Sequence, residues 1–226
     1  MRRTLTDIDE ELVAQMREHA TAYAASTPIR RVAVVANAPL EPSEERRDLI
    51  DTSDLVIRCN SLALDRVDDP PCVGTRTNVV VTARTTRPTP GFLKDYRNRA
   101  YFVGDTFSLD VPEPVGWPSY WPADLGPWPL PNRALGLPLK YLLRPTRGGL
   151  GVFPTTGTQA VYLAYRMFPE ADIVLTGFSF LDDREQDSWG YHADLPDAPV
   201  HATHKLDREG AYLQGLVDRG EVRYVA

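Results

Sequence analysis

The chain has 226 residues, of which 42% are hydrophobic and 25% charged, as is typical of a folded globular protein. Its formal net charge of −6 argues against nucleic-acid binding, which depends on a basic face that neutralises phosphates. No run approaches the ~18 apolar residues of a membrane span, and the N-terminus lacks the apolar segment of a secretory signal. We therefore expect a cytoplasmic protein whose two cysteines are reduced.

The spacing of apolar residues predicts an N-terminal helix followed by alternating strands and helices. Apolar side chains recur every three to four residues from Ile8 to Tyr23, so we expect an amphipathic helix within residues 1–28, ended by Pro28. Short β-branched runs follow, which are typical of strands buried on both faces. We expect strands at residues 32–36, 55–57, 79–81, 101–103, 173–175 and 222–225, and helices at residues 42–50, 155–167 and 206–217.

This alternation predicts an α/β fold, with a mostly parallel sheet flanked by helices in one Rossmann-like domain over residues 1–226. Residues 112–138 differ from the rest, because they hold eight prolines together with Trp117, Trp121 and Trp128. Proline lacks an amide donor and disrupts sheet ladders, so we expect a loop here. Its tryptophans would pack it onto the body or, in a lid, offer a stacking wall to a sugar.

Polar residues follow two of the predicted strands at the point where each strand ends. Asn37 comes after the first, and Arg58 and Asn60 come after the second. The carboxyl ends of parallel strands share one edge, where ligands bind in open α/β sheets. An asparagine offers a ligand both a donor and an acceptor, but it is also a common turn residue. Taken singly, each of these residues leaves both interpretations open.

Thr155, Thr156 and Gly157 stand at the start of the helix predicted over residues 155–167. Hydroxyl groups and free amides at a helix N-terminus form an anion site that suits a phosphate or a carboxylate. The same residues also serve as an ordinary helix cap, in which a side-chain oxygen accepts a bond from the helix backbone. The residues alone do not choose between these two uses.

Three histidines, His192, His201 and His204, lie close together in the sequence, and histidine is the side chain best suited to proton transfer near neutral pH. They lack the spacing of zinc motifs, with no H-E-x-x-H or C-x-x-C. Asp7 and Asp9 form a D-x-D pair, but they fall on the predicted N-terminal helix rather than at a strand end. We therefore expect neither a metal site nor a cofactor.

Taken in order, these segments resemble the motifs of the sialyltransferase family. VAVVANAPL, IDTSDLVIRCNSL and VGTRTNVVV follow one another as in the family's long motif, with Ala36 where the family usually has glycine. FPTTGTQAVYLAYRMFPEADIVLTGFSF resembles the short motif. Trp189-Gly190-Tyr191-His192 is similar to the aromatic–histidine motif, and HKLDRE matches the final H-x4-E motif. The resemblance runs from about residue 31 to residue 215.

This resemblance implies a Rossmann-like variant of the GT-A and GT-B glycosyltransferase architectures. It also implies an inverting, metal-independent transfer from a CMP-activated sugar, sialic acid by default, to a hydroxyl group of an acceptor. His204 would be the general base, and His192 would contact the phosphate and stabilise the leaving group. The remaining donor contacts implied by the motifs are Asn37, Asn60, Thr155, Thr156 and Gly157.

Arg58, Tyr191 and Glu209 would play supporting roles. Residues five apart on a helix lie about 140° around its axis, so His204 and Glu209 are not same-face partners on one helix. We therefore interpret Glu209 as structural rather than catalytic.

Other functions remain open at this point. The donor sugar would be another cytidine- or uridine-nucleotide sugar if the protein served specialised-metabolite assembly. The same residues would also serve a nucleotide-sugar hydrolase, whereas a non-catalytic nucleotide-sugar-binding protein would need no base. In each case we expect a nucleotide-sugar ligand, joined in a transferase by a small-molecule or glycan acceptor. The sequence predicts neither the acceptor nor the oligomeric state.

Overall fold

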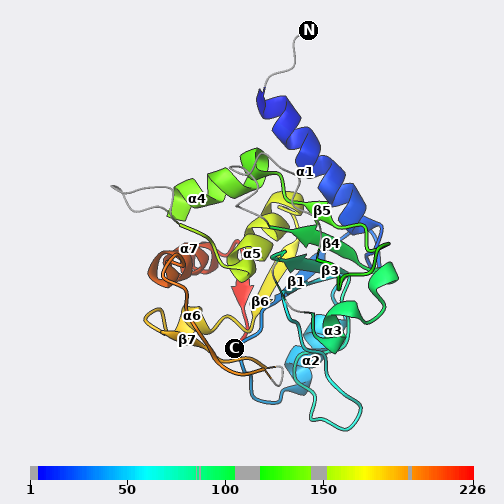
Figure 1. The fold of residues 1–226 in the computed structure, drawn as a ribbon, viewed down its shortest axis with the longest axis vertical. Helices are drawn as coiled ribbons and strands as arrows, with labels where there is room; N and C mark the ends of the chain where they lie inside the picture. The colour runs from blue at the N-terminus through cyan, green and yellow to red at the C-terminus, as the bar shows by residue number, and fades with distance from the viewer. Residues whose placement is uncertain (1–4, 85, 87, 105–117, 144–151, 193–194) are drawn as a thin grey trace.

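The computed structural model describes residues 5–84, 86, 88–104, 118–143, 152–192 and 195–226. Its main element is a seven-stranded sheet in which all the described strand pairs are parallel (Figure 1). In sheet order the strands are β5 (Trp128–Pro129), β4 (Ala100–Val103), β3 (Val79–Thr82), β2 (Leu55–Cys59), β1 (Arg31–Val35), β6 (Asp172–Thr176) and β9 (Arg223–Tyr224). The structure confirms the predicted α/β fold.

The strands stay parallel, but the side of the sheet on which the chain adds its next strand changes between β1 and β6. From β1 the chain steps outward through β2, β3 and β4 to β5, and it then returns to place β6 on the other side of β1. The helix that precedes β6 is α5 (Thr156–Met167), which packs across β1, β2 and β3. In open parallel sheets a ligand crevice forms beyond the carboxyl ends of the strands at such a change. The topology therefore places a crevice next to the residues that follow β1 and β6.

Both faces of the sheet are buried, which explains why the strands read as continuous apolar runs. Val32 and Val34 of β1 face one core, whereas Ala33 and Val35 face another. The first face is covered by α1 (Leu5–Thr21), α4 (Leu137–Leu143), α5 and α7 (Leu206–Asp218), and the second by α2 (Glu44–Asp51) and α3 (Pro90–Leu93) (Figure 1). No helix in the described ranges has the length and hydrophobicity to cross a bilayer.

The smaller elements lie in the connections. A 3-10 helix, η1 (Tyr96–Asn98), precedes β4, and a short helix, α6 (Ser179–Asp182), follows β6. Further along the chain, β7 (Ser188–Trp189) and β8 (Ala198–Pro199) pair in an antiparallel ribbon. This ribbon precedes the loop that carries His201 and His204 into α7.

The N-terminal helix is shorter than its apolar pattern suggests. It ends at Thr21, and the amides of Tyr23 and Ala24 then bond to carbonyls three residues back, which tightens the chain into turns. The amide of Ala25 donates to the carbonyl of Asp54. The Asp54 side chain in turn accepts from the amides of Arg30 and Arg31, so these contacts direct the chain into β1.

The prediction of a loop over residues 112–138 is wrong for part of its described portion, residues 118–138. Trp128 and Pro129 form the edge strand β5, and an edge position tolerates a proline because one side of the strand needs no ladder bond. A π-helix, η2 (Asn132–Gly136), then leads into α4. Trp128 stacks on His19 at 4.4 Å between ring centroids, and Trp121 is buried against Phe92. Both of these tryptophans therefore pack onto the body, while Trp117 lies outside the described residues.

Candidate active site

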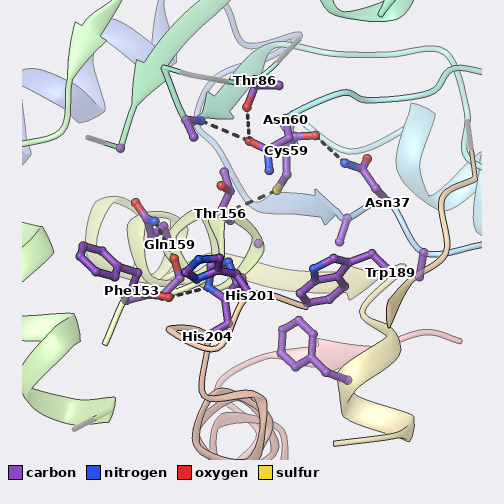
Figure 2. Close-up of a pocket in the computed structure, with 18 of the residues that line it drawn as sticks. Asn37, Cys59, Asn60, Thr86, Phe153, Thr156, Gln159, Trp189, His201 and His204 are labelled. Atoms are coloured by element: carbon purple, nitrogen blue, oxygen red, sulfur yellow. Dashed lines mark hydrogen bonds between the residues drawn. The ribbon is translucent and has the colours of Figure 1, made fainter. Parts of the chain in front are cut away.

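A cavity of about 660 Å³ opens at the carboxyl ends of the central strands (Figure 2). Its size is that of an ordinary small-molecule site. Its walls come from the ends of β1, β2 and β3, the start of α5, the turn after β6, the end of β7 with the residues that follow it, and the loop between β8 and α7. The lining residues are Ala36, Asn37, Ala38, Cys59, Asn60, Ala83, Arg84, Thr86, Gly104, Phe153, Pro154, Thr155, Thr156, Gly157, Gln159, Gly177, Ser179, Phe180, Trp189, Gly190, Tyr191, His201, Thr203 and His204.

The charge of this cavity differs from that of the whole chain. Although the chain has a formal net charge of −6, no aspartate or glutamate occurs among the described lining residues. Arg84 is the one lining residue of this set with a formal charge at neutral pH. A site lined in this way favours an anionic ligand over a cationic one. Across the described part of the chain, no group of three or more His, Cys, Asp or Glu residues is placed to hold a metal ion.

Asn37 and Asn60 both lie in the cavity wall, as their positions after strands predict, and both also join neighbouring strands. The Asn37 Nδ2 atom donates to the backbone carbonyl oxygen of Cys59 at 2.9 Å. The Asn60 Oδ1 atom accepts from the amide of Ala83 at 3.2 Å and from the hydroxyl group of Thr86 at 3.0 Å (Figure 2). Asn60 has a φ of 46°, a left-handed conformation that asparagine tolerates better than most residues. Within the described part of the chain, each side chain thus retains one amide atom for a ligand, Oδ1 of Asn37 and Nδ2 of Asn60.

Arg58 does not project into the cavity, contrary to the sequence-based expectation that it would join this polar rim. Its side chain is fully buried, and it donates to the backbone carbonyls of Ala63, Val73 and Arg76. Burial lowers the pKa of Arg58 to about 10, so it stays protonated at neutral pH. Because a buried cation needs acceptors, the chain after β2 wraps around it. Arg58 therefore supports the wall that carries Asn60 and does not line it.

The start of α5 is held by Glu209, which comes from α7. Thr155 is the N-cap of α5, and its amide and hydroxyl groups donate to Glu209 Oε2 at 2.9 and 2.6 Å. The hydroxyl group of Thr158 donates to the same oxygen at 2.5 Å. Glu209 is fully buried, and this burial raises its pKa, while these hydrogen bonds and nearby His204 act in the opposite direction.

Because Glu209 holds Thr155, the residues at the start of α5 have different roles. The Thr155 hydroxyl group is occupied by Glu209, so Thr155 is not available to a ligand in the way that the motif implies. Thr156 and Gly157 also line the cavity, and they are the first residues of a 12-residue helix. Their amides have no acceptor within the helix, because the first turn of an α-helix lacks preceding carbonyls. The anion site expected at this helix therefore reduces to the amides of Thr156 and Gly157.

His204 has a defined tautomer in the cavity wall. Its Nδ1 atom lies 2.6 Å from the backbone carbonyl oxygen of Phe153 (Figure 2). A carbonyl oxygen only accepts hydrogen bonds, so Nδ1 carries the proton and, in the neutral ring, Nε2 carries the lone pair. The ring also packs edge-on to Trp189, with the centroids 6.3 Å apart. In the neutral ring, this arrangement leaves Nε2 as a hydrogen-bond acceptor in the cavity wall.

His201 and His192 occupy different places from those that the sequence indicates. His201 belongs to the histidine cluster, and the motifs assign it no role, yet it lines the cavity, and its ring centroid lies 6.5 Å from that of His204. His192, which the motif assigns to the phosphate, is not among the residues that line the cavity. Its amide donates to the carbonyl oxygen of Asn37 at 2.8 Å, which places its backbone at the end of β1. The neighbouring Tyr191 does line the cavity, and burial raises its pKa.

The turn after β6 lets the chain pass close to β1. Gly177 has a φ of +73°, and a Cβ atom built there would lie 2.9 Å from the carbonyl oxygen of Ala36. The amide of Ala36 donates to the carbonyl of Thr176, and the amide of Ala38 donates to that of Gly177. A glycine is required here on both conformational and steric grounds. The turn therefore joins the carboxyl ends of the parallel strands β1 and β6.

Sequence reasoning missed several lining residues, among them Arg84, Thr86, Phe153 and Gln159. Phe153 acts through its backbone carbonyl, and a main-chain contact leaves no trace in residue type. The side chain of Gln159 donates to the carbonyl oxygen of Pro154, and its position one turn into α5 gives no sign in the sequence of more than a helical role. For Arg84 and Thr86 the available signal was their place just after β3, at the same edge as Asn37 and Asn60.

Solved structures with this architecture include two of mammalian sialyltransferases. One, described as a mammalian sialyltransferase, has a TM-score of 0.54 and 14% sequence identity over 100% of this chain and 86% of that chain. The chain has a sialyltransferase-like fold. The other, a mammalian sialyltransferase in complex with Gal-beta-1-3GalNAc-ortho-nitrophenol, has a TM-score of 0.54 and 17% identity over 87% of this chain and 69% of that one. No protein-family model and no curated protein sequence matches the chain.

The sialyltransferase-like fold agrees with the resemblance seen in the motifs. The long motif supplies β1, β2 and β3, and the short motif supplies α5 and β6, so together they enclose the point between β1 and β6 where the side of strand addition changes. The last motif begins at His204, just before α7, and ends at Glu209 within it. Segments that are far apart in sequence therefore meet around one cavity.

Proposed function

We propose that this protein is a glycosyltransferase that moves sialic acid from a CMP-activated donor to a hydroxyl group of an acceptor, with inversion of configuration. The observation that carries the proposal is the tautomer of His204. Its Nδ1–H bond to the Phe153 carbonyl leaves Nε2 as a proton acceptor in the wall of the cavity. A hydroxyl group becomes a competent nucleophile when a base removes its proton as it attacks.

The proposed transfer releases one proton from the acceptor, and His204 alone is sufficient to accept it. The acceptor oxygen forms a bond to the anomeric carbon of the sugar while its proton passes to Nε2 of His204. The bond from the anomeric carbon to the phosphate oxygen breaks, and CMP leaves with the electron pair from the opposite face. The imidazolium that results keeps its Nδ1–H bond to the Phe153 carbonyl, which stabilises the charged ring.

Donor binding is assigned to the opposite wall and to the start of α5. The atoms that Asn37 and Asn60 retain, one acceptor and one donor, suit the polar edges of a nucleoside. The amides of Thr156 and Gly157 suit the phosphate, because a helix N-terminus favours negative charge. The absence of acidic side chains from the described cavity lining also supports an anionic donor.

We further propose that the transfer needs no divalent metal. CMP carries a single phosphate ester, whose developing charge can be stabilised by preorganised hydrogen-bond donors. Carboxylates are the usual ligands of a magnesium or manganese ion bound with a nucleotide, and the described cavity residues include none. A glycan hydroxyl is the acceptor class we propose, supported by the glycan analogue bound in one of the similar structures.

The first test is nucleotide binding measured as a shift in melting temperature, with and without a chelator. A ligand that binds the folded state raises the melting temperature by mass action. We expect CMP to raise it more than UMP, AMP or GMP, with no effect of chelator. A preference for UMP would contradict the cytidine donor, and no response to any nucleotide would contradict the proposed function.

The second test is transfer itself. Incubation with CMP-sialic acid and a panel of galactose-terminated glycans is expected to yield CMP and a sialylated glycan in equal amounts. CMP release that does not depend on any glycan would instead identify a hydrolase. Retention of donor binding without turnover under all conditions would identify a non-catalytic binding protein.

A further inference from the structure

The two histidines that line the cavity are held in opposite tautomers. His201 Nδ1 accepts a hydrogen bond from the amide of Thr203 at 3.3 Å, and the Thr203 hydroxyl oxygen lies 2.7 Å from the same nitrogen. An amide only donates, so Nδ1 of His201 carries the lone pair and Nε2 carries the proton in the neutral ring. His204 shows the reverse, with Nδ1–H bound to a carbonyl. One ring therefore offers an acceptor at Nε2, and the other offers a donor.

Burial in the core does not hold His201 in this arrangement. Its side chain is exposed to solvent, and its hydrogen-bond partner is only two residues away in the sequence. A ring held by such local bonds at the edge of a cavity has a fixed orientation and one nitrogen left for a ligand. Because Nδ1 is taken by Thr203, that nitrogen is Nε2.

We propose that His201 donates its Nε2–H to an anionic oxygen of the donor substrate, either on the phosphate or on a carboxylate of the sugar. This inference rests on the proposed function, and it assigns to His201 a contact that the motif resemblance assigns to His192. His201 belongs to the cavity wall with His204, whereas His192 does not.

The chemistry of the cavity favours an anion as the partner of His201. A neutral N–H donor gains most from a charged acceptor, and hydrogen bonds to charged groups are roughly twice as strong as neutral ones. Loss of such a bond is expected to weaken binding by roughly tenfold to a hundredfold. His201 in this tautomer is also unsuited to act as a base through Nε2, so it complements His204 and does not duplicate it.

Two substitutions separate the hydrogen-bond donor at Nε2 from the bulk of the imidazole ring. In His201→Gln the side-chain amide nitrogen reaches about as far as Nε2 and still donates, whereas His201→Phe keeps an aromatic ring without a donor. His19→Phe is the matched control, because His19 stacks on Trp128 and does not line the cavity. All three variants are compared with the wild-type chain by calorimetric titration and by melting temperature.

The ligands are cytidine, CMP and a 3-fluoro analogue of CMP-sialic acid, which resists turnover and carries both anions. We expect His201→Phe to bind cytidine as the wild type does, and His201→Gln to retain most of the wild-type affinity for the other two ligands. Weaker CMP binding by His201→Phe places the contact on the phosphate. Unchanged CMP binding with weaker binding of the analogue places it on the sugar carboxylate.

Three results would overturn the inference while leaving the proposed function intact. These are wild-type affinity of His201→Phe for every ligand, equal losses in His201→Phe and His201→Gln, and a loss that already appears with cytidine. Failure of the wild-type chain to bind any of the three ligands would overturn both.

Discussion

Glu209 Oε2 lies 2.6 Å from the hydroxyl oxygen of Thr155, which fixes α7 to the first turn of α5 beneath the cavity. We expect Glu209→Ala to destabilise the fold by about 1–3 kcal/mol, because it leaves the buried hydroxyl groups of Thr155 and Thr158 without their acceptor. Urea unfolding monitored by circular dichroism measures the change. Glu10→Ala is the control, since Glu10 forms an exposed pair with Arg166, and its loss is expected to cost less than about 1 kcal/mol. Equal effects of the two substitutions would contradict the stabilising role of the Glu209 hydrogen bonds.

Glu209 also makes stability depend on pH in a defined direction. Burial raises the pKa of Glu209 above its ordinary value of 4.5, so the folded state binds the proton more tightly than the unfolded state. This contribution is fully present below pH 4.5 and is lost as pH rises through the folded-state pKa. We expect Glu209→Gln, which stays neutral, to gain stability relative to the wild type as pH rises from 4.5. A stability difference that does not change with pH would contradict this prediction.

His204→Ala removes the proposed base. We expect the transfer rate at saturating substrate to fall by about 10²–10⁴-fold, which is the usual contribution of a general base, with CMP affinity nearly unchanged. Single-turnover assays and calorimetric titration of CMP measure the two quantities separately. Loss of CMP affinity with an unchanged rate constant for bound donor would assign His204 to binding rather than to proton transfer.

Gly177→Ala tests the close approach of β6 to β1. The new Cβ atom would lie 2.9 Å from the Ala36 carbonyl oxygen, in addition to the strain of a φ of +73°. Gly220→Ala is a matched control, because its φ is +70° and no atom outside the local chain lies within 4 Å of a new Cβ. We expect Gly220→Ala to cost about 1–2 kcal/mol and Gly177→Ala clearly more. Chemical denaturation of both variants measures the difference, and equal losses would show that the contact with Ala36 relaxes freely.

The central strands could be predicted because burial on both faces leaves a simple mark in the sequence. Val32, Val34, Val79 and Val81 all pack in the same core, and the runs that contain them have no competing helical period. The edge strand β5 could not be predicted in this way. Its two residues, Trp128 and Pro129, belong to a proline-rich segment, and they form a strand because their backbone pairs with β4.

The site was predictable in its location but not in the direction of each side chain. Asn37 and Asn60 line the cavity as expected, since strand ends meet at one edge of a parallel sheet. Arg58 is close to the same edge but turns inward, because three carbonyls of the following loop surround it. Nothing in residue type distinguishes those carbonyls from others. Whether His192 or His201 lines the cavity similarly depends on how the chain folds around the β7–β8 ribbon.

The bonds that Asn37 and Asn60 make to neighbouring strands have a consequence for how a ligand arrives. Half of each amide is already committed to the protein, to Cys59 in one case and to Ala83 and Thr86 in the other. These side chains therefore have few rotamers left to lose when a nucleoside docks against them. We therefore expect a nucleoside to bind to a preorganised wall, with little adjustment of the backbone at the ends of β1, β2 and β3.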